Sequence, residues 1–233
     1  VMDLSSIALI PDGNRRYAQL AGISLAESYS LGTKKAWDVL LWLTNYPKIK
    51  FGTFYTLSLE NLSRSPLELK VLFKVFEKEL DKVPSQAILK EHQIRLKFIG
   101  KKEAFPKKLQ EKMAKAEEFT HDHGEKTIYL ALGYNGQQEI VDAAKKIAKD
   151  YSQNSFDLES LNENTFKKYL YADFPEPDLI IRTSGTQRLS SFLTYQSAYS
   201  ELFFTEKYWP ELTRQDIDAA IAEYGARKRK FGK

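Results

Sequence analysis

Short apolar segments alternate along this chain with longer stretches of helical period, and this alternation constrains the fold more than any other feature. Five segments are short, β-prone and apolar enough to be buried: Ser6 to Ile10, Phe51 to Leu57, Ile94 to Ile99, Thr127 to Leu132 and Leu179 to Arg182. Strands separated by helices usually pair in parallel, because each connection crosses back over the sheet. The pattern predicts a single-domain α/β fold with a mainly parallel central β-sheet flanked by helices.

Amphipathic spacing predicts the helices. The longest follows Pro66, and its apolar positions are Leu69, Leu72, Phe73, Phe76, Leu80 and Val83. A second begins at Pro106, and a third follows Asn135, which can cap it with Gln138 three positions on. The inner face of the third helix should carry Ile140, Ala144 and Ile147. A final helix carries Ile217, Ala220, Ile221 and Tyr224.

Composition bounds the class of protein. The 233 residues show no repeat or linker, so we expect one domain over 1–233, and 42% hydrophobic residues supply its core. The 35 basic and 31 acidic residues nearly balance, which disfavours nucleic acid as a partner. The absence of cysteine excludes disulfides and favours an intracellular protein. Without a secretory signal or an apolar run of ~20 residues, we expect a cytoplasmic protein, with peripheral contact to a membrane surface left open.

A polar loop follows the first predicted strand. It reads Pro11-Asp12-Gly13-Asn14-Arg15-Arg16 and lies at the strand end where α/β sheets place their binding sites. Glycine lets the backbone approach a phosphate, arginines neutralise its oxygens, and one carboxylate can hold Mg²⁺ together with substrate phosphates. An ordinary turn with solvated arginines explains the short segment equally well.

A second loop repeats this pattern after the last predicted strand. Arg182 and Arg188 can fork onto phosphate oxygens while Ser190 donates from its hydroxyl. Two anion sites suggest two phosphorylated substrates, although pairing with surface carboxylates is the alternative. Glu201 lies among apolar neighbours, so its carboxylate needs a partner such as an arginine or a metal.

Taken together, these segments resemble the cis-prenyltransferase family, which includes undecaprenyl diphosphate synthases and dehydrodolichyl diphosphate synthases. The resemblance runs from Ile7 to Gly232 in four blocks: 12–18, 58–64, 178–190, and 199–202 with Trp209-Pro210. It implies a Mg²⁺-dependent prenyltransferase of isoprenoid biosynthesis that condenses an allylic prenyl diphosphate with isopentenyl diphosphate. The product would be a cis-prenyl diphosphate, with release of diphosphate. The resemblance also implies a homodimer and an apolar channel, which the helix after Pro66 could line, although core packing explains most of its positions.

The resemblance also assigns roles to residues. Asp12 is the catalytic aspartate that binds Mg²⁺, Glu201 is a second metal-linked carboxylate, and Asn14 with Ser58 assists proton movement. The implied substrate contacts are Gly13, Arg15 and Arg16 in the allylic loop, Asn61 and Arg64 in the second block, and Arg182, Arg188 and Ser190 at the homoallylic diphosphate. Lys230 and Gly232 correspond to a tail that reaches the partner's active site, with Lys230 in place of an arginine.

Several positions depart from the family pattern. Leu25 and Tyr29 occupy positions where bacterial members place an arginine and a histidine on the allylic diphosphate, and Thr186 replaces a glutamate. Leu62 stands in place of an aromatic residue. These changes support an alternative reaction, an irregular coupling in which dimethylallyl diphosphate is the acceptor.

Two readings lie outside catalysis on this scaffold. A non-catalytic partner subunit of a two-component prenyltransferase would typically lack the aspartate that Asp12 retains. Nucleic-acid binding by the basic residues 227–230 lacks an accompanying aromatic platform. Zinc is disfavoured as well, because His121 and His123 have no matching third ligand.

Overall fold

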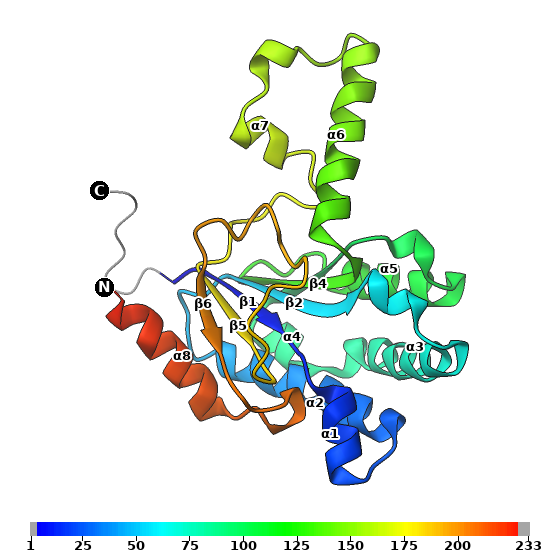
Figure 1. Cartoon of the computed structure of the whole chain (residues 1–233), viewed down its shortest axis with the longest axis vertical. Coiled ribbons are helices and arrows are strands. Elements are labelled where there is room, and N and C mark those ends of the chain that lie inside the picture. Colours follow the sequence, from blue (N-terminus) through cyan, green and yellow to red (C-terminus); the bar gives the residue numbers. More distant parts are fainter. Residues whose placement is uncertain (1–3, 228–233) are drawn as a thin grey trace.

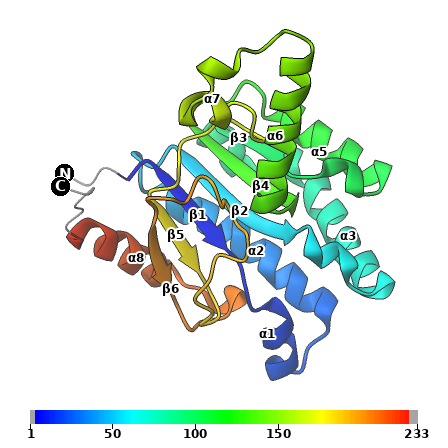
Figure 2. The same ribbon diagram turned by 45° about the horizontal axis from the view of Figure 1, so that its top comes forward.

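The computed structural model describes residues 4–227. Over this range the chain forms one six-stranded sheet of order β3-β4-β2-β1-β5-β6, in which every pair of neighbours is parallel (Figure 2). The strands are β1 (Ser6–Ile10), β2 (Phe51–Ser58), β3 (Ile94–Ile99), β4 (Lys126–Tyr134), β5 (Leu179–Arg182) and β6 (Glu201–Phe204). The predicted fold class is confirmed.

The described residues also form eight α-helices and several short 3₁₀ turns. The helices are α1 (Asn14–Ala21), α2 (Leu25–Leu43), α3 (Pro66–Asp81), α4 (Ala87–Glu91), α5 (Lys107–Phe119), α6 (Gly136–Ser152), α7 (Glu163–Lys167) and α8 (Arg214–Ala226). Among the 3₁₀ turns, η1 (Glu60–Ser63) follows β2 and η5 (Trp209–Glu211) follows β6. None of the helices in the described part of the chain combines the length and apolarity needed to span a membrane.

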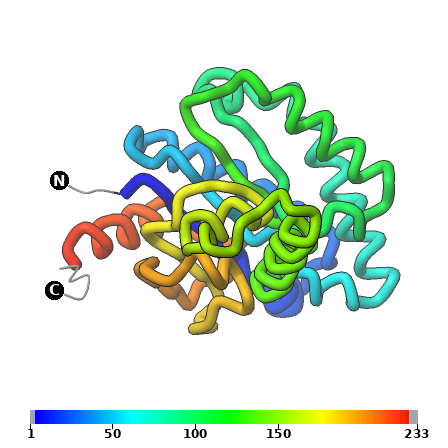
Figure 3. The backbone as a smooth tube through the Cα atoms, turned by 90° about the horizontal axis from the view of Figure 1, so that it is seen from above, coloured from blue at the N-terminus to red at the C-terminus, as the bar shows by residue number. Residues whose placement is uncertain are grey.

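The sheet separates two hydrophobic cores, because successive side chains of a strand point to opposite faces. On β1, Ile7 and Leu9 enter a large core shared with α2, α3, α5 and α8. Ala8 and Ile10 enter a smaller core on the other face, with Phe174 and Phe192. Helix α6 projects away from the sheet with α7 beside it (Figure 1), and Figure 3 views α6 end-on.

The carboxyl ends of β1, β2 and β5 lie next to one another at the point where the strand order reverses. β1 lies between β2 and β5, with Leu9 opposite Phe54 on one side and Ile10 opposite Arg182 on the other. The loops that leave β1, β2 and β5 therefore lie side by side at the carboxyl edge of the sheet. This is the position at which open α/β sheets bind ligands.

Local signals explain where several helices begin. Ser65 caps α3 by accepting a hydrogen bond from the backbone N–H of Glu68, and Pro66 occupies the first turn. Asn135 caps α6 as predicted, accepting from the N–H of Gln138. The side chain of Gln138 donates to Asp142.

The structure corrects the sequence prediction at several elements. β1, β3 and β5 have the predicted bounds, and β2 and β4 are longer than predicted. β6, α1, α2, α4 and α7 were not predicted. On α6, Ala144 is exposed and Ala143 is buried in its place. The four apolar positions predicted for the last helix are all buried.

Candidate active site

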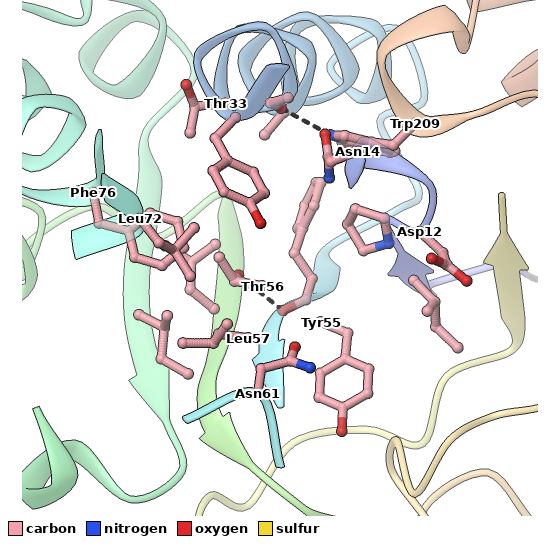
Figure 4. A pocket seen from close by; sticks show the side chains of 18 of the residues that line it. Asp12, Asn14, Thr33, Tyr55, Thr56, Leu57, Asn61, Leu72, Phe76 and Trp209 are labelled. Carbon is pink, nitrogen blue, oxygen red and sulfur yellow. Dashed lines mark hydrogen bonds between the residues drawn. The ribbon is translucent and has the colours of Figure 1, made fainter. Parts of the chain in front are cut away.

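A cavity of about 670 Å³ begins at these strand ends and extends beneath the sheet face covered by α2 and α3 (Figure 4). Its polar lining comes from the loops after β1, β2 and β5. The cavity brings together eleven predicted site residues: Asp12, Gly13, Asn14, Arg15, Arg16, Ser58, Asn61, Arg64, Arg182, Arg188 and Ser190. Residues 170 positions apart in sequence thus share one site.

Asp12 lies at the centre of the polar end. Its Oδ2 accepts a hydrogen bond from Nη2 of Arg182 at 2.9 Å, and Nη2 of Arg16 lies 3.4 Å away. Burial by itself would raise the pKa of Asp12, but hydrogen bonds from Arg182 and Ser184 and the charges of both arginines lower it below its ordinary value. The carboxylate is therefore ionised at neutral pH and available to a cation.

Arg182 is fixed by contacts on both sides. Its Nη1 donates to the Ser190 hydroxyl at 2.9 Å and to the carbonyl of Arg188, and its side chain is only 5% exposed. Nε of Arg182 is buried and has no hydrogen-bond partner. An anion in the cavity could accept a hydrogen bond from this buried donor and so remove the cost of leaving it unpaired.

The Asp12 loop is clamped from two directions. Thr183 accepts from the N–H of Asp12 at 2.8 Å and donates to its carbonyl at 2.6 Å, while the N–H of Trp209 donates to the same carbonyl. Gly13 has a φ of +105°, and a Cβ at this position would lie 2.6 Å from the ring of Tyr208. A left-handed backbone against an aromatic ring requires glycine.

The end of β2 presents the next polar residues. Irregular pairing with β4 beyond Tyr55 shifts the register of Leu57 and Ser58. Ser58 accepts from the N–H of Asn61 through its hydroxyl, and Asn61 accepts from the N–H of Ser58. Ser58, Asn61 and Asn14 all line the cavity, and the Oδ1 of Asn14 is buried without a partner.

The deeper part of the cavity is apolar. It runs along α3 past Leu72, Phe76 and Leu80 to Val83 just beyond the helix, beneath side chains of β2, β3 and β4. Trp37, Phe54, Leu57, Leu96, Phe98, Ile128, Leu130 and Leu132 form the opposite walls. Two positions of the predicted helix face do not line it: Leu69, and Phe73, whose ring packs 5.6 Å from that of Phe105.

One carboxylate interrupts the deep apolar end. Glu79 accepts from Nε1 of Trp37 at 3.2 Å and pairs with Lys82 at 2.6 Å, and its side chain is 16% exposed. Both Glu79 and Trp37 line the cavity. These contacts compensate the carboxylate for its removal from water.

Glu201 is not brought to the cavity. It begins β6 opposite Leu179, whereas Phe204, three residues on, pairs with Arg182 at the site. Three residues of strand separate the two ends by roughly 10 Å, so Glu201 and Asp12 of one chain do not share a metal. The partner of Glu201 is Arg227, at 2.6 Å. Lys230 and Gly232 lie outside the described residues.

The donors present fit Mg²⁺ only together with a substrate. Within residues 4–227 no group of three or more His, Cys, Asp and Glu side chains could hold a metal ion. Mg²⁺ commonly binds through one or two carboxylates and completes its shell with water and substrate phosphates. Ionised Asp12, surrounded by arginines that would hold a diphosphate, matches that pattern.

Comparisons with known proteins decide the family. The family model described as "Putative undecaprenyl diphosphate synthase" matches residues 10–232. This chain belongs to that family of cis-prenyltransferases. A tritrans,polycis-undecaprenyl-diphosphate synthase (geranylgeranyl-diphosphate specific) of Pyrobaculum aerophilum is 40% identical over 97% of this chain and 95% of its own length. An isoprenyl transferase of Thermus thermophilus is 38% identical over 97% of the chain and 88% of its own length.

Solved structures support the same family. A crystal structure of lavandulyl diphosphate synthase from Lavandula x intermedia, in complex with dimethylallyl diphosphate, superimposes with a TM-score of 0.93 at 32% identity. That comparison covers 100% of this chain and 99% of the plant enzyme. A probable undecaprenyl diphosphate synthase from Campylobacter jejuni gives a TM-score of 0.82 at 27% identity, with full coverage of both chains. As in the family at large, the chain is a prenyl diphosphate synthase.

Sequence reasoning assigned no role to four residues that shape the site. Thr183 and Trp209 hold the Asp12 loop, and Tyr208 packs on Gly13 and Arg16. Glu68 lies behind Arg15 and Arg64. The sequence did hold a signal for Glu68, because Arg64 stands four positions before it, a spacing at which opposite charges can pair. Its position in the first turn of α3 indicated only a favourable helix start.

Proposed function

We propose that this chain elongates an allylic prenyl diphosphate with isopentenyl diphosphate, forming a cis double bond and releasing diphosphate in the presence of Mg²⁺. The observation that carries the proposal is the single cavity, which joins an arginine-rich mouth around one ionised carboxylate to a deep apolar channel. A prenyl diphosphate has the same two parts, a highly charged head and an apolar tail.

The mouth residues divide between the two diphosphates. Arg16 and the N–H groups at the start of α1 receive the allylic diphosphate, as helix N-termini favour anions, and Arg15 and Arg64 border the same position. Arg182, Arg188 and Ser190 receive the diphosphate of the acceptor. A Mg²⁺ ion on Asp12, when bound, would stabilise the charge that develops on the leaving diphosphate.

Asn14 and Ser58 complete the reaction. After the acceptor double bond attacks the allylic carbon, a proton must leave the new unit, and both side chains line the cavity where it is lost. Their amide and hydroxyl groups can relay this proton towards the departing diphosphate, which becomes a good acceptor as it leaves. The surrounding guanidiniums remain protonated and hold the charge in place.

The volume of the channel favours elongation. At the packing density of protein interiors, one five-carbon unit needs roughly 110 Å³, so a chain of four units needs roughly 440 Å³. The whole cavity, whose about 670 Å³ also includes the polar mouth, can hold such a chain. Geranylgeranyl diphosphate, which the name of the Pyrobaculum relative gives as its specific substrate, has four units and fits this volume. We therefore propose it as the starter to test first.

Incubation of the purified chain with Mg²⁺, each allylic diphosphate and isopentenyl diphosphate, followed by product mass, tests the proposal. Products that increase by one five-carbon unit at a time are expected. Products without an isopentenyl-derived unit would contradict elongation, and full turnover by the chain alone would exclude a non-catalytic subunit. Light scattering of the same sample tests the homodimer that the family resemblance implies.

Irregular coupling of two dimethylallyl diphosphates is the second candidate. It is favoured by the close structural likeness to lavandulyl diphosphate synthase and by Leu25, Tyr29 and Thr186. Its ten-carbon product would leave most of the channel empty, which is why we place it second. Supplying dimethylallyl diphosphate alone separates the two, because only irregular coupling then gives a product.

A further inference from the structure

Tyr29 is one of the residues that depart from the family pattern, and its side chain lies at the polar end of the cavity. Tyr29 as a whole is only 6% exposed. The hydroxyl donates to Oε1 of Glu68 at 2.7 Å and accepts from Nη1 of Arg64 at 3.1 Å. Tyr29 belongs to α2, and the other two residues lie on either side of the start of α3. One hydroxyl thus joins two helices across the mouth.

Glu68 is the centre of this cluster. Its Oε1 lies 3.2 Å from Nη1 of Arg64 and 3.7 Å from Nε of Arg15. The Glu68 side chain is 10% exposed and does not line the cavity, whereas Arg15, Arg64 and Tyr29 do. The carboxylate therefore lies behind the residues that face the ligand and acts through them.

The two arginines are held to different degrees. The Arg64 side chain is 22% exposed and is anchored through one nitrogen by both Tyr29 and Glu68. The Arg15 side chain is 59% exposed and has the longer contact to the carboxylate. Anchoring one arm of a guanidinium fixes the plane of the whole fork, so the direction of Arg64 is set before any ligand binds.

Burial and the hydrogen bond to Glu68 raise the pKa of Tyr29 to about 12, so the hydroxyl keeps its proton across the physiological range. It can therefore serve as a constant donor to Glu68 while accepting from Arg64. No change of protonation in the reaction involves it.

We propose that Tyr29 is a positioning residue that, together with Glu68, orients Arg64 to hold the diphosphate of the allylic substrate. This inference rests on the proposed function for the identity of that ligand. Tyr29 stands where bacterial members place a residue that contacts the diphosphate directly. In this chain it would still contribute to binding, but indirectly, through Arg64.

Tyr29→Phe tests the proposal because it removes only the hydroxyl and leaves the net charge of the mouth unchanged. A hydrogen bond to a charged group contributes enough to change binding about tenfold. We expect the Kd of geranylgeranyl diphosphate, measured without acceptor, to rise about tenfold, with KM rising in parallel and kcat changing less than about twofold. An unchanged Kd would overturn the proposal.

Glu68→Gln separates positioning from competition. The substitution adds one net positive charge to the mouth, so a carboxylate that merely competes with the ligand for arginines would give tighter binding when neutralised. Positioning predicts the opposite, a Kd raised roughly tenfold, since Arg64 loses its ionic anchor. Tighter or unchanged binding by Glu68→Gln would contradict the positioning role of this carboxylate.

Tyr46→Phe is the matched control. The Tyr46 hydroxyl donates to Asp218 at 2.5 Å, a contact of the same chemistry outside the cavity. Both tyrosine variants should lower Tm by similar amounts, and only Tyr29→Phe should weaken ligand binding. An equal rise in Kd for both variants would mean that Tyr29 acts through general stability alone.

The same measurements keep this inference apart from the proposed function. A wild-type chain that binds geranylgeranyl diphosphate but forms no elongated product would refute elongation, while the Kd of Tyr29→Phe would still decide the positioning role. A wild-type chain that binds neither that diphosphate nor inorganic diphosphate would refute both.

Discussion

At the scale of single residues, the site depends on a carboxylate held within a group of guanidiniums. Arg182 and Arg16 keep Asp12 ionised, and Thr183 with Trp209 fixes the backbone that carries it. Most of these contacts join segments distant in sequence. The chemistry of Asp12 therefore depends on the geometry of three neighbouring strand ends.

Replacing Asp12 by Asn should abolish most activity while preserving the shape of the side chain. The loss of the negative charge would remove the proposed cation site and leave Arg182, whose side chain is 5% exposed, without its counter-ion. We expect kcat to fall by about 10³-fold and the unfolding free energy by about 2 kcal/mol. Steady-state kinetics and chemical denaturation measure the two effects, and near-normal kcat at saturating Mg²⁺ would refute the assignment.

Gly13 and Gly22 offer a matched pair for backbone strain. Gly22 has a φ of +65° and no atom within 4 Å of the position that a Cβ would occupy, whereas at Gly13 the Tyr208 ring lies 2.6 Å from that position. Gly22→Ala should cost about 1 kcal/mol, and Gly13→Ala about 3 kcal/mol because the ring must also move. Denaturation curves compare them, and equal losses would show that the ring yields freely.

Residue types could be predicted better than contacts. The sequence indicated two polar loops because charged and small residues follow apolar strands, and eight predicted site residues of these loops line the cavity. The other three, Ser58, Asn61 and Arg64, came only from the resemblance to cis-prenyltransferases. It could not indicate that Glu201 starts its strand at the far end from Asp12, since register depends on pairing with β5. The role of Tyr29 was equally hidden, because it depends on how α2 meets α3.

At the scale of secondary structure, α3 combines two tasks. Its first turn carries Glu68, which anchors Arg64 at the mouth, and its later turns, from Leu72 to Leu80, line the apolar channel. The eight steps from Leu72 to Leu80 rise about 12 Å along the helix axis. A change late in α3 should therefore alter product length without disturbing diphosphate binding.

Leu80→Trp tests this division. The larger ring would occupy channel space comparable to part of one isoprene unit, so we expect the main product to shorten by about one unit with little change in the KM of the starter. Leu69→Trp, on the same helix but outside the cavity, is the control and should leave product length unchanged. Mass spectrometry of the products compares them, and identical product lengths would place the limit elsewhere.

Two of the elements that were not predicted lack the sequence pattern typical of their type. β6 has four half-buried residues and no alternation of exposed and buried positions, so it lacks the period of a strand. α1 begins at a left-handed glycine and has Ala18 as its one buried residue, so it resembles a loop. By contrast, α8 was predicted because its buried positions follow the helical period.

At the scale of the whole molecule, the two ends of the sheet carry different kinds of basic side chain. The carboxyl edge holds the arginines, whereas the opposite end buries a lysine. Lys126, at the start of β4, is 7% exposed and donates to the carbonyls of Tyr46 and Ile49. Burial and the charge of Lys50 lower the pKa of Lys126 from 10.5 to about 8.

This shift predicts how stability varies with pH. Between pH 8 and 10.5 the unfolded chain keeps the Lys126 proton that the folded chain releases, so stability rises with pH, by up to about 1.4 kcal/mol per unit. Lys126→Met should flatten that rise, and Lys48→Met, at an exposed neighbouring lysine, should retain it. Denaturant titrations at pH 8 and pH 10 measure both, and an unchanged slope in Lys126→Met would refute the lowered pKa.

The route of the chain around the cavity has a practical consequence. None of residues 133–181, a stretch that is described throughout and includes the projecting α6 and α7, lines the cavity. The cavity lining is thus encoded on either side of this stretch, by residues up to 132 and from 182 onward. Anything recognised by that projection, or any module grafted onto its tip, can be exchanged independently of which carbon–carbon bond the enzyme forms.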